Sequence, residues 1–284
     1  MHPVIAYPGT AGSFSEGAAR AAFPAGTPQG YATFPQAAEA AASGAADYAL
    51  LPVENSFAGA VLPTYALLEG LPLHIVGEIL RPVRHQLVGI PGASLAALTT
   101  ISSHPQAIAQ CDAFLATLPG VRLIPSANTA ISAREVALRG DPACAAIASE
   151  EAAQAYGLAV LKADIQTSQT NTTRFLILSR SEMPLGKPDK ATVVFRVRDE
   201  VGALVRVLAS FAQAGLNMSR IESRPLPETP FQYFFSADFV GEMDAAHLRC
   251  AMDAARPLTE ELRLLGAYPR GRQETGRAGT LPAR

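Results

Sequence analysis

The sequence has no tryptophan, only three cysteines and few charged residues, which make up 17% of the chain. Without tryptophan, and with aromatic residues at 7%, few side chains are available for single-stranded nucleic acid to stack on. The net charge is −2, so the chain also lacks the excess of basic residues that nucleic acids and anionic membranes attract. Its apolar runs are shorter than the roughly 20 residues needed to cross a bilayer. We therefore expect no nucleic-acid partner and no membrane association.

Cysteine and histidine are too scattered to predict a disulfide framework or a metal site. Cys111, Cys144 and Cys250 are odd in number and widely spaced, and the sequence has neither a CxxC pair nor an HExxH motif. The first residues, MHPVIAYPGT, form a strand-like run without the basic segment of a secretory signal. These features predict a protein of a reducing, cytoplasmic compartment.

The chain is long enough for two or three domains, and its first 180 residues alternate short β-rich runs with Ala-rich helical runs. Several of these helices are expected to end at a glycine, namely Gly44, Gly140 and Gly157. The alternation predicts an α/β fold with largely parallel sheets. The expected strands cover residues 4–7, 48–53, 73–80, 84–90, 99–102, 121–125, 144–148 and 174–179.

The pattern changes after residue 180. The stretch SEMPLGKPDK (181–190) combines prolines, a glycine and charges, which is typical of a linker. Residues 191–268 then follow the order β-α-β-β-α-β, with helices at about 202–214 and 244–256, which predicts a ferredoxin-like unit. The polar stretch 269–284 has no apolar period and is predicted to be disordered.

Three junctions between a strand and a helix carry capping motifs. Ser13 with Glu16, and Ser103 with Gln106, fit the capping box, and Ser149 is a third N-cap. Helix N-termini that meet beyond the carboxyl ends of parallel strands can bind carboxylates or phosphates. We interpret Ser149 as a cap alone. The glycines of GTAGS, before the first of these helices, also allow a ligand to approach the backbone closely, although the stretch is neither a Rossmann fingerprint nor a P-loop.

A polar stretch follows one apolar strand directly. Its residues are Glu54, Asn55 and Ser56, and a carboxylate there could act as acid, base or hydrogen-bond acceptor. A turn with an Asx-type backbone bond would also explain Asn55 or Ser56.

A second polar stretch precedes another strand. Arg174 there could hold a carboxylate bidentately, while Asn171 and Thr173 supply neutral donors. A solvated loop with a surface ion pair explains this stretch equally well. Of the histidines, His104 stands out because it lies at the start of a capped helix, whereas His74 and His85 alternate with apolar residues and are interpreted as structural.

Taken together, these segments resemble prephenate dehydratase over residues 4 to about 268. The motifs are YPGTAGSFSEGAA, LPVENSFAGAV, HIVGEI, SHPQAIAQC, AAIAS followed by YGL, NTTRFLIL and VGALVRVLASFAQAGLNMSRIESRP. The resemblance implies an α/β catalytic region of two lobes, similar to periplasmic binding proteins, over residues 1–180. Lobe 1 would comprise about 1–80 and 162–180, and lobe 2 about 81–161. Residues 191–268 resemble an ACT domain, and relatives of this kind form homodimers or homotetramers.

The resemblance also implies the reaction, in which prephenate loses CO2 and water to give phenylpyruvate without a metal or organic cofactor. The key threonine corresponds to Thr173, and Glu54 and His104 are the titratable candidates behind it. The implied substrate-binding residues are Arg174 as carboxylate holder, with Asn55, Ser56, Ser13, Gln106, Asn171 and Phe175.

In the ACT-like part, two motifs correspond to phenylalanine-binding motifs of the family, which implies L-phenylalanine as an allosteric effector. They are GALV (Gly202, Ala203, Leu204, Val205) and ESRP (Glu222, Ser223, Arg224, Pro225), with Asn217 nearby. The chain departs from the family pattern at Thr10, Ser13 and Val201, where relatives often have Pro, Thr and Pro; these changes bear on substrate choice and effector response.

Two other functions are compatible with the same residues. Arogenate, which carries an amino group in place of the side-chain keto group, could be the substrate. A non-catalytic amino-acid sensor could combine binding-protein lobes with an ACT domain.

Overall fold

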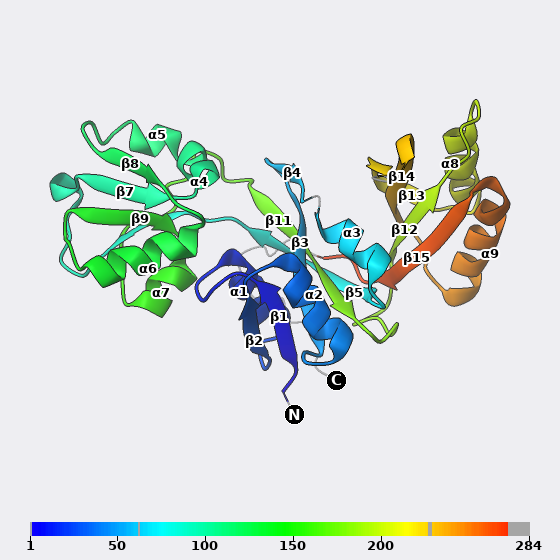
Figure 1. Ribbon diagram of the computed structural model, residues 1–284, viewed down its shortest axis with the longest axis horizontal. Coiled ribbons are helices and arrows are strands. Elements are labelled where there is room, and N and C mark those ends of the chain that lie inside the picture. Colours follow the sequence, from blue (N-terminus) through cyan, green and yellow to red (C-terminus); the bar gives the residue numbers. More distant parts are fainter. Residues whose placement is uncertain (1, 62, 227–228, 272–284) are drawn as a thin grey trace.

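Three α/β bodies lie in a row in the computed structural model, which describes residues 2–61, 63–226 and 229–271 (Figure 1). We call them lobe 2, lobe 1 and the C-terminal unit, in the order from left to right in the figure. The fold-class prediction is confirmed: two α/β lobes are joined to a ferredoxin-like βαββαβ unit.

Lobe 1 is built around a sheet with the strand order β2-β1-β3-β11-β5, in which β4 also pairs with β3. The strands are β1 (Val4–Pro8), β2 (Thr27–Tyr31), β3 (Tyr48–Asn55), β4 (Gly59–Ala60), β5 (His74–Pro82) and β11 (Thr172–Ser179). Helix α1 (Phe14–Ala22) covers one face of this sheet. Helices α2 (Phe34–Ser43) and α3 (Pro63–Gly70) pack on the other face.

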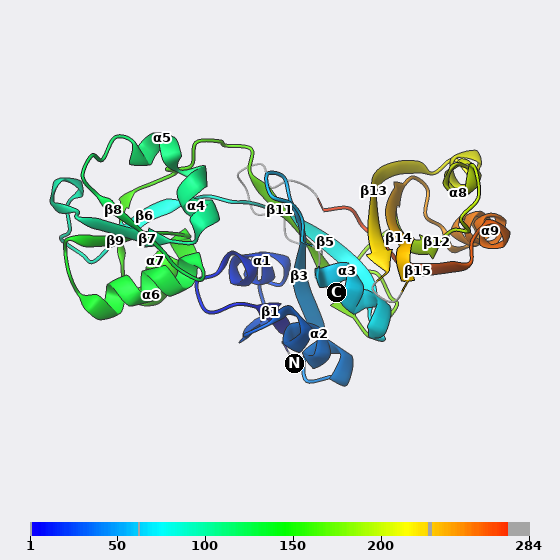
Figure 2. The same cartoon turned by 45° about the horizontal axis from the view of Figure 1, so that its top comes forward.

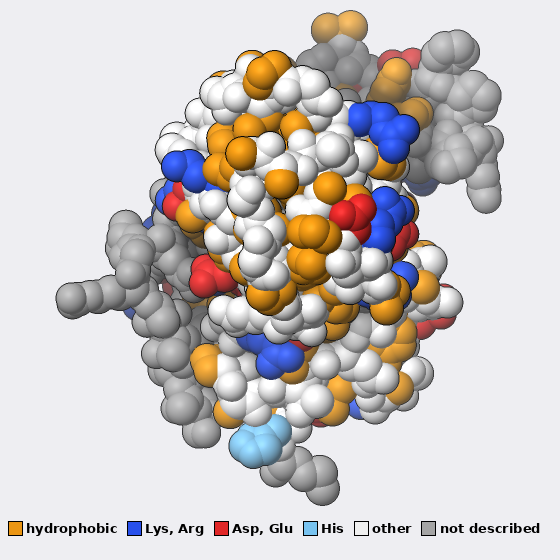
Figure 3. Space-filling view, turned by 90° about the vertical axis from the view of Figure 1, so that its left-hand side faces the viewer, with side chains coloured by type: hydrophobic (Ala, Val, Ile, Leu, Met, Phe, Trp, Pro, Cys, Tyr) orange, Lys and Arg blue, Asp and Glu red, His pale blue; other side chains and the backbone are white. Residues whose placement is uncertain are grey.

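Lobe 2 has a sheet of order β10-β6-β9-β7-β8. Its strands are β6 (Gln86–Gly89), β7 (Thr100–Ser103), β8 (Arg122–Pro125), β9 (Cys144–Ala148) and β10 (Ala159–Lys162). Helices α4 (Pro105–Gln110) and α5 (Asp112–Leu115), with the 3-10 turn η1 (Leu95–Ala97), cover one face, and α6 (Thr129–Arg139) and α7 (Glu150–Tyr156) cover the other. Seen end-on, lobe 2 shows mainly uncharged side chains with scattered charged groups (Figure 3).

Both sheets are mixed, which corrects the prediction of largely parallel sheets. Strands β2, β1 and β3 run parallel, but β11 lies antiparallel between β3 and β5. In lobe 2, β7, β8 and β9 run parallel, while β6 is antiparallel to both of its neighbours. The reason is topological: the chain leaves lobe 1 after β5 and returns along β11 in the opposite direction.

The C-terminal unit is a four-stranded antiparallel sheet of order β13-β14-β12-β15. Its elements are β12 (Lys190–Arg196), α8 (Ala203–Gln213), β13 (Asn217–Leu226), β14 (Thr229–Val240), α9 (Ala245–Ala255), η2 (Arg256–Leu258) and β15 (Glu261–Tyr268). Helices α8 and α9 lie on the face turned away from lobe 1 (Figure 2).

The other face of this sheet completes the hydrophobic core of lobe 1. Phe234, Leu265 and Tyr268 belong to the same buried cluster as Leu176 and Leu178 of β11. The backbones also approach closely, because a Cβ placed on Gly266 would lie 2.1 Å from the Ile75 carbonyl oxygen. The C-terminal unit is therefore packed directly against lobe 1 through this face.

Most predicted helix ends are found where the sequence places them, with one correction. Ser13 and Ser149 are N-caps, and Gly44, Gly140 and Gly157 are left-handed C-caps. The cap of α4, however, is His104 rather than Ser103, because the Ser103 hydroxyl donates to the Ile147 carbonyl across the sheet at 2.7 Å.

The first three residues of the stretch predicted to be disordered have a defined place in the structure. Arg270 pairs with Asp189, and the Gly271 N–H donates to Glu78 Oε1 at 3.0 Å, so residues 269–271 continue along lobe 1. The rest of that stretch, 272–284, lies outside the described residues. Across the described chain, none of the helices has both the length and the apolar character of a membrane span.

Candidate active site

One end of the lobe 1 sheet adjoins both segments that connect the lobes. These crossing segments are residues 83–85, after β5, and residues 163–171, before β11. We call this end of the sheet the crossing end. Because β11 runs antiparallel to β3, its first residues pair with the last residues of β3, and Thr173 lies opposite Asn55. The two polar stretches singled out in the sequence therefore meet in space.

The Asn55 amide fixes the role of the Thr173 hydroxyl. Asn55 Oδ1 accepts from the N–H groups of Phe57 and Ala58, each at 3.0 Å, so the amide nitrogen must point the other way. Asn55 Nδ2 donates to Thr173 Oγ1 at 2.9 Å and to Asn171 Oδ1 at 2.8 Å. Since Thr173 Oγ1 accepts this bond, its own proton is available to donate away from Asn55.

Unpaired polar atoms are also buried in this region. Asn171 is 3% exposed, and because its Oδ1 is taken by Asn55, its Nδ2 has no partner among the described residues. Thr10 Oγ1 in the glycine-rich turn is likewise buried and unpaired. Buried donors without partners are rare in folded proteins, so these two atoms distinguish this region from the rest of lobe 1.

The glycine-rich turn after β1 connects lobe 1 directly to lobe 2. Ser13 caps α1 by accepting from the Glu16 N–H at 3.2 Å. Ser149 caps α7, and its hydroxyl also donates to the Gly12 carbonyl at 2.6 Å, so it is more than the simple cap predicted. A Cβ on Gly12 would lie 2.5 Å from Ala152 Cα, which shows how closely the turn approaches α7. The turn is therefore a contact between the lobes.

Lobe 2 contributes His104 and Gln106 at the carboxyl end of β7. His104 Nδ1 accepts from the Gln106 N–H at 3.2 Å, which leaves Nε2 of the neutral ring to carry the proton. Because β7 and β9 are parallel, their carboxyl ends lie at the same edge of the sheet, and the residue after β9, Ser149, touches lobe 1. His104 thus lies on the edge of lobe 2 that faces lobe 1, whereas the Gln106 side chain is exposed.

His85 lies in the first crossing segment and is 2% exposed. Its Nε2 pairs with Gln110 Oε1 at 2.8 Å, Phe14 packs edge-on against its ring, and Nδ1 is unpaired among the described residues. Burial lowers the pKa of His85, and the bond to Gln110 offsets this only in part. The ring is therefore neutral and occupies the junction of the two lobes.

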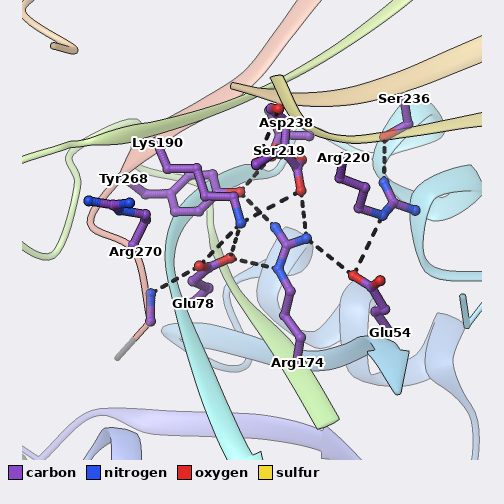
Figure 4. Close-up of polar contacts among 12 residues, drawn as sticks. Glu54, Glu78, Arg174, Lys190, Ser219, Arg220, Ser236, Asp238, Tyr268 and Arg270 are labelled. Atoms are coloured by element: carbon purple, nitrogen blue, oxygen red, sulfur yellow. Dashed lines mark hydrogen bonds and ion pairs between the residues drawn. The ribbon is translucent and has the colours of Figure 1, made fainter. Parts of the chain in front are cut away.

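Arg174 lies elsewhere than predicted. Successive residues of a strand point to opposite faces, so Arg174 points away from the Thr173 side and toward the C-terminal unit (Figure 4). Its guanidinium contacts Glu78 Oε2 at 2.6 Å, Asp238 Oδ2 at 2.5 Å and the Tyr268 hydroxyl at 3.0 Å. With these donors engaged, Arg174 is not available to hold a substrate carboxylate.

Three more of the predicted site residues have surroundings that differ from those the sequence predicted. Glu54 pairs in register with Arg174 and shares its face, so it does not lie behind Thr173. The Ser56 hydroxyl accepts from the Thr172 N–H at 3.0 Å and donates to the Thr170 carbonyl at 3.3 Å. These bonds tie the residue after β3 to the start of β11. Phe175 is 1% exposed and packs in the core beneath α1.

The charges around Arg174 form a cluster, which we call the interface charge cluster: Glu54, Glu78, Arg174, Lys190, Arg220, Glu222 and Asp238. Figure 4 labels all of these residues except Glu222. Burial disfavours the Asp238 carboxylate, but Arg174 and Lys190 outweigh it and hold the pKa of Asp238 below its usual range. Burial, and then Asp238, raise the pKa of Tyr268 well above that of a free phenol, so Tyr268 stays a neutral donor.

The two predicted effector motifs lie on different parts of the C-terminal unit. Gly202, Ala203, Leu204 and Val205 line a pocket on the helix-covered side of the sheet, beside Tyr233 and Phe235. Ser223 and Pro225 share that side, because they pair in register with Phe235 and Tyr233.

Glu222 and Arg224 point to the opposite side, toward lobe 1. Glu222 pairs with Arg220, and the Arg224 guanidinium lies 5.4 Å from the centre of the Tyr65 ring in α3. The ESRP motif is therefore divided between the two faces of β13. Asn217 is exposed at the start of this strand.

Sequence reasoning missed Glu78, Lys190, Asp238 and Tyr268, although a signal was present. Each charged member interrupts or borders an apolar strand, in HIVGEIL, DKATVVF and FFSADFV. A charge in a buried strand requires a partner, and three such strands indicate a shared cluster. Among the residues the structure describes, no group of three or more His, Cys, Asp or Glu side chains is placed to hold a metal ion.

Comparisons with known proteins identify the family of this chain. The family model described as prephenate dehydratase matches residues 5–183. An arogenate dehydratase/prephenate dehydratase of Arabidopsis thaliana is 38% identical, over 93% of this chain and 72% of its own length.

Two solved structures are similar over nearly the whole chain. A prephenate dehydratase of Arthrobacter aurescens, solved in complex with L-Phe, is 34% identical with a TM-score of 0.84, over 99% of this chain and 92% of its own. GqqA, described as a novel type of quorum quenching acylase, is 38% identical with a TM-score of 0.87, over 94% of this chain and 98% of its own. The ordered motifs, the two-lobed fold and these matches lead to one conclusion: this chain belongs to the prephenate dehydratase family.

Proposed function

We propose that the chain converts prephenate to phenylpyruvate, CO2 and water, with Thr173 as the residue that assists departure of the ring hydroxyl. The observation that carries this proposal is the fixed Asn55 amide. Because Asn55 occupies an acceptor position of the Thr173 hydroxyl, the threonine proton is directed outward.

The reaction requires one proton and no redox change. The bond from the ring to its carboxylate breaks, and the electron pair enters the ring as CO2 departs. The ring C–O bond then breaks, and the oxygen takes up a proton to leave as water. Aromatisation supplies the driving force, so orientation and stabilisation of the developing hydroxide are what the protein must contribute.

Each residue at the crossing end can be given a role in this scheme. Thr173 donates to the leaving oxygen, but its hydroxyl is too weak an acid to supply the proton permanently. His104 is the titratable candidate for the proton source across the lobes, because Glu54 lies on the other face. To donate, its ring must first take up a proton from solvent, so that the imidazolium gives one proton to the leaving oxygen and returns to the neutral form. The unpaired Asn171 Nδ2 and Thr10 Oγ1 are donors for the oxygens of the substrate.

Arogenate is the second candidate substrate, since curated relatives that are 36–38% identical carry that name. It differs by an ammonium group, which would need an acceptor. The carboxylates of Glu16 and Glu151 are each paired with an arginine, which favours the keto substrate.

The C-terminal unit is proposed to be an ACT domain that binds L-phenylalanine and inhibits the enzyme. The Arthrobacter aurescens relative was solved with L-Phe, and the GALV residues of this chain line a pocket. We further propose that the protein works as a cytoplasmic homodimer or homotetramer.

The experiment is turnover of prephenate by purified protein, followed as phenylpyruvate absorbance in alkali. Thr173→Ala should lower kcat by about 10²–10³-fold, as loss of one hydrogen bond to a developing oxyanion does, while Thr173→Ser should retain most activity. Thr172→Ala removes a hydroxyl one residue away and serves as the matched control. Full activity of Thr173→Ala would refute the role of this hydroxyl.

Parallel samples with arogenate, read as phenylalanine release, decide between the substrates. An acyl-amide substrate tests for the activity in the description of GqqA. Binding of L-phenylalanine without turnover of any substrate would instead establish the amino-acid sensor.

A further inference from the structure

At the crossing end, strands β3 and β11 carry neutral polar side chains on one face and charged side chains on the other. Asn55 pairs with Thr173 in register, and the next residues inward, Glu54 and Arg174, also pair. The first pair forms the neutral cluster proposed to act on substrate. The second pair belongs to the interface charge cluster (Figure 4). A shift of Glu54 is therefore transmitted through one peptide unit to Asn55.

Glu54 is the loosely held member of the cluster. Its Oε2 lies 3.7 Å from Arg174 Nη1 and 3.7 Å from Arg220 Nε, and its side chain is 42% exposed. Arg174 is 8% exposed and anchored by Glu78 and Asp238. Arg220 is thus the partner through which the C-terminal unit can change the position of Glu54.

Arg220 is also tied to the predicted effector segment. Its Nη2 pairs with Glu222, the first residue of ESRP, and its guanidinium lies 4.6 Å from the centre of the Tyr65 ring. Ser223, the next residue of β13, faces the side of the pocket lined by GALV. A ligand that moves β13 from that side would therefore move Glu222, which changes how Arg220 is shared between Glu222 and Glu54.

We propose that Arg220 and Glu54 are positioning residues that connect the pocket of the C-terminal unit to Thr173. Arg220 divides its charge between Glu222 and Glu54, and the Glu54 position sets the placement of Asn55 and hence of the Thr173 hydroxyl. The proposal rests on the proposed function, because it uses Thr173 as the group that acts on substrate.

The test is a double-mutant cycle of Glu54→Gln and Arg220→Gln, measured on kcat, on KM and on inhibition by L-phenylalanine. Each single variant should lower kcat by about three- to tenfold with KM nearly unchanged, and the double variant should be no worse than either. The concentration of L-phenylalanine for half-inhibition should rise by about tenfold. Arg220→Lys, which keeps the charge, should restore most of both properties.

Arg249→Gln is the control, because it removes an exposed positive charge of the same unit on α9, outside the interface charge cluster. Additive effects of the two substitutions, or unchanged inhibition in both single variants, would overturn the proposal. Binding of L-phenylalanine is measured separately by calorimetry. No binding to the wild-type protein would refute the proposed effector, whereas non-additive kcat values without effector would still support the link between Arg220 and Glu54.

Discussion

At the scale of single residues, the site depends on a neutral amide and a neutral hydroxyl. Asn55 Nδ2 donates to Thr173 Oγ1 at 2.9 Å and cannot accept in return, so the threonine proton is free to point toward a leaving group. The turn N–H groups that hold Asn55 Oδ1 prevent the amide from rotating by half a turn. The direction of the Thr173 hydroxyl is therefore set by the turn that holds Asn55.

Asn55→Asp tests this arrangement with almost no change in shape. One carboxylate oxygen can still accept from Phe57 and Ala58, but the other would now accept from Thr173 and turn its proton inward. We expect kcat to fall by about 10²-fold with the fold retained, as judged by circular dichroism. A kcat close to that of the wild-type protein would show that the hydroxyl direction does not matter.

His85 should make the stability of the protein dependent on pH. Its pKa in the folded protein lies below the ordinary 6.5, because burial disfavours the charged ring. Between these two values the unfolded chain binds a proton that the folded chain does not, so stability is full above about pH 6.5 and falls as the pH decreases.

We therefore predict that His85→Gln flattens the dependence of the free energy of unfolding on pH between about pH 5 and pH 7. Urea unfolding at several pH values measures it. Parallel curves for the variant and the wild-type protein would contradict the prediction. The pKa of Asp238 is lowered below the ordinary 3.8 in the folded protein. The stability that the Asp238 carboxylate contributes is therefore lost only at a pH below this range, and it does not affect the comparison between pH 5 and pH 7.

Sequence reasoning brought Thr173 and Asn55 into one site but placed Arg174 with them. The alternation of side chains along a strand was enough to separate them, since Thr173 and Arg174 are neighbours in β11 and must face opposite sides. What the sequence alone could not indicate is which face looks toward lobe 2. That depends on how the C-terminal unit packs against lobe 1.

At the scale of secondary-structure elements, the turn between β1 and α1 is one part of lobe 1 that meets lobe 2; Arg81 of β5, which pairs with Glu151 of α7 at 2.9 Å, is another. Gly12 adopts φ +78 and approaches α7 so closely that any side chain would collide with the helix backbone. Tyr156 at the end of α7 adds a hydrogen bond to the Ala11 carbonyl at 2.8 Å. Helix α7 and the turn therefore set the spacing of the lobes.

Gly12→Ala should push the lobes apart and lower kcat/KM strongly. Gly92→Ala is the matched control, because Gly92 has a similar φ of +88 but nothing within 4 Å of its Cβ position. Both variants should lose about 1–2 kcal/mol of stability from the left-handed backbone, whereas only Gly12→Ala should lose activity. Equal activities in the two variants would show that contact between the turn and α7 is not needed for turnover.

Two features of the elements escaped the sequence patterns. Strand β2, with the sequence TPQGY, has neither alternation nor β-branched residues beyond Thr27, because it is an edge strand whose side chains are largely exposed. The antiparallel direction of β11 also cannot be predicted from the residues of this strand, because the direction depends on where the chain re-enters lobe 1.

At the scale of the whole molecule, the interface charge cluster fixes how the C-terminal unit docks on lobe 1. A buried ion cluster contributes little net stability, because desolvation of the charges offsets their attraction. It does penalise every other arrangement, since a shift would leave Asp238 or Glu78 without a partner. The cluster therefore favours one docking geometry of the C-terminal unit on lobe 1. The apolar contacts supply most of the free energy that holds the two units together.

Gly266→Ala should disrupt this docking, since its Cβ would lie 2.1 Å from the Ile75 carbonyl oxygen. We expect a lower melting temperature and faster limited proteolysis near residues 181–190. Gly70→Ala, at a glycine with nothing within 4 Å of its Cβ position, is the control. A Gly266→Ala protein as resistant to protease as this control would contradict close packing of the two units.

The cluster of apolar residues shared by lobe 1 and the C-terminal unit has a consequence for how this protein can be divided. If the chain were cut at the linker, the part of this cluster that lies in lobe 1, including Ile75 of β5, would lose the residues Phe234, Leu265 and Tyr268 that complete it. The shortened protein would expose an apolar sheet face to water and would tend to aggregate through it. A lobe pair of this kind could therefore not gain or exchange its C-terminal unit by gene fusion alone. Its exposed apolar face would first have to become more polar, because an insoluble intermediate would have no activity on which selection could act.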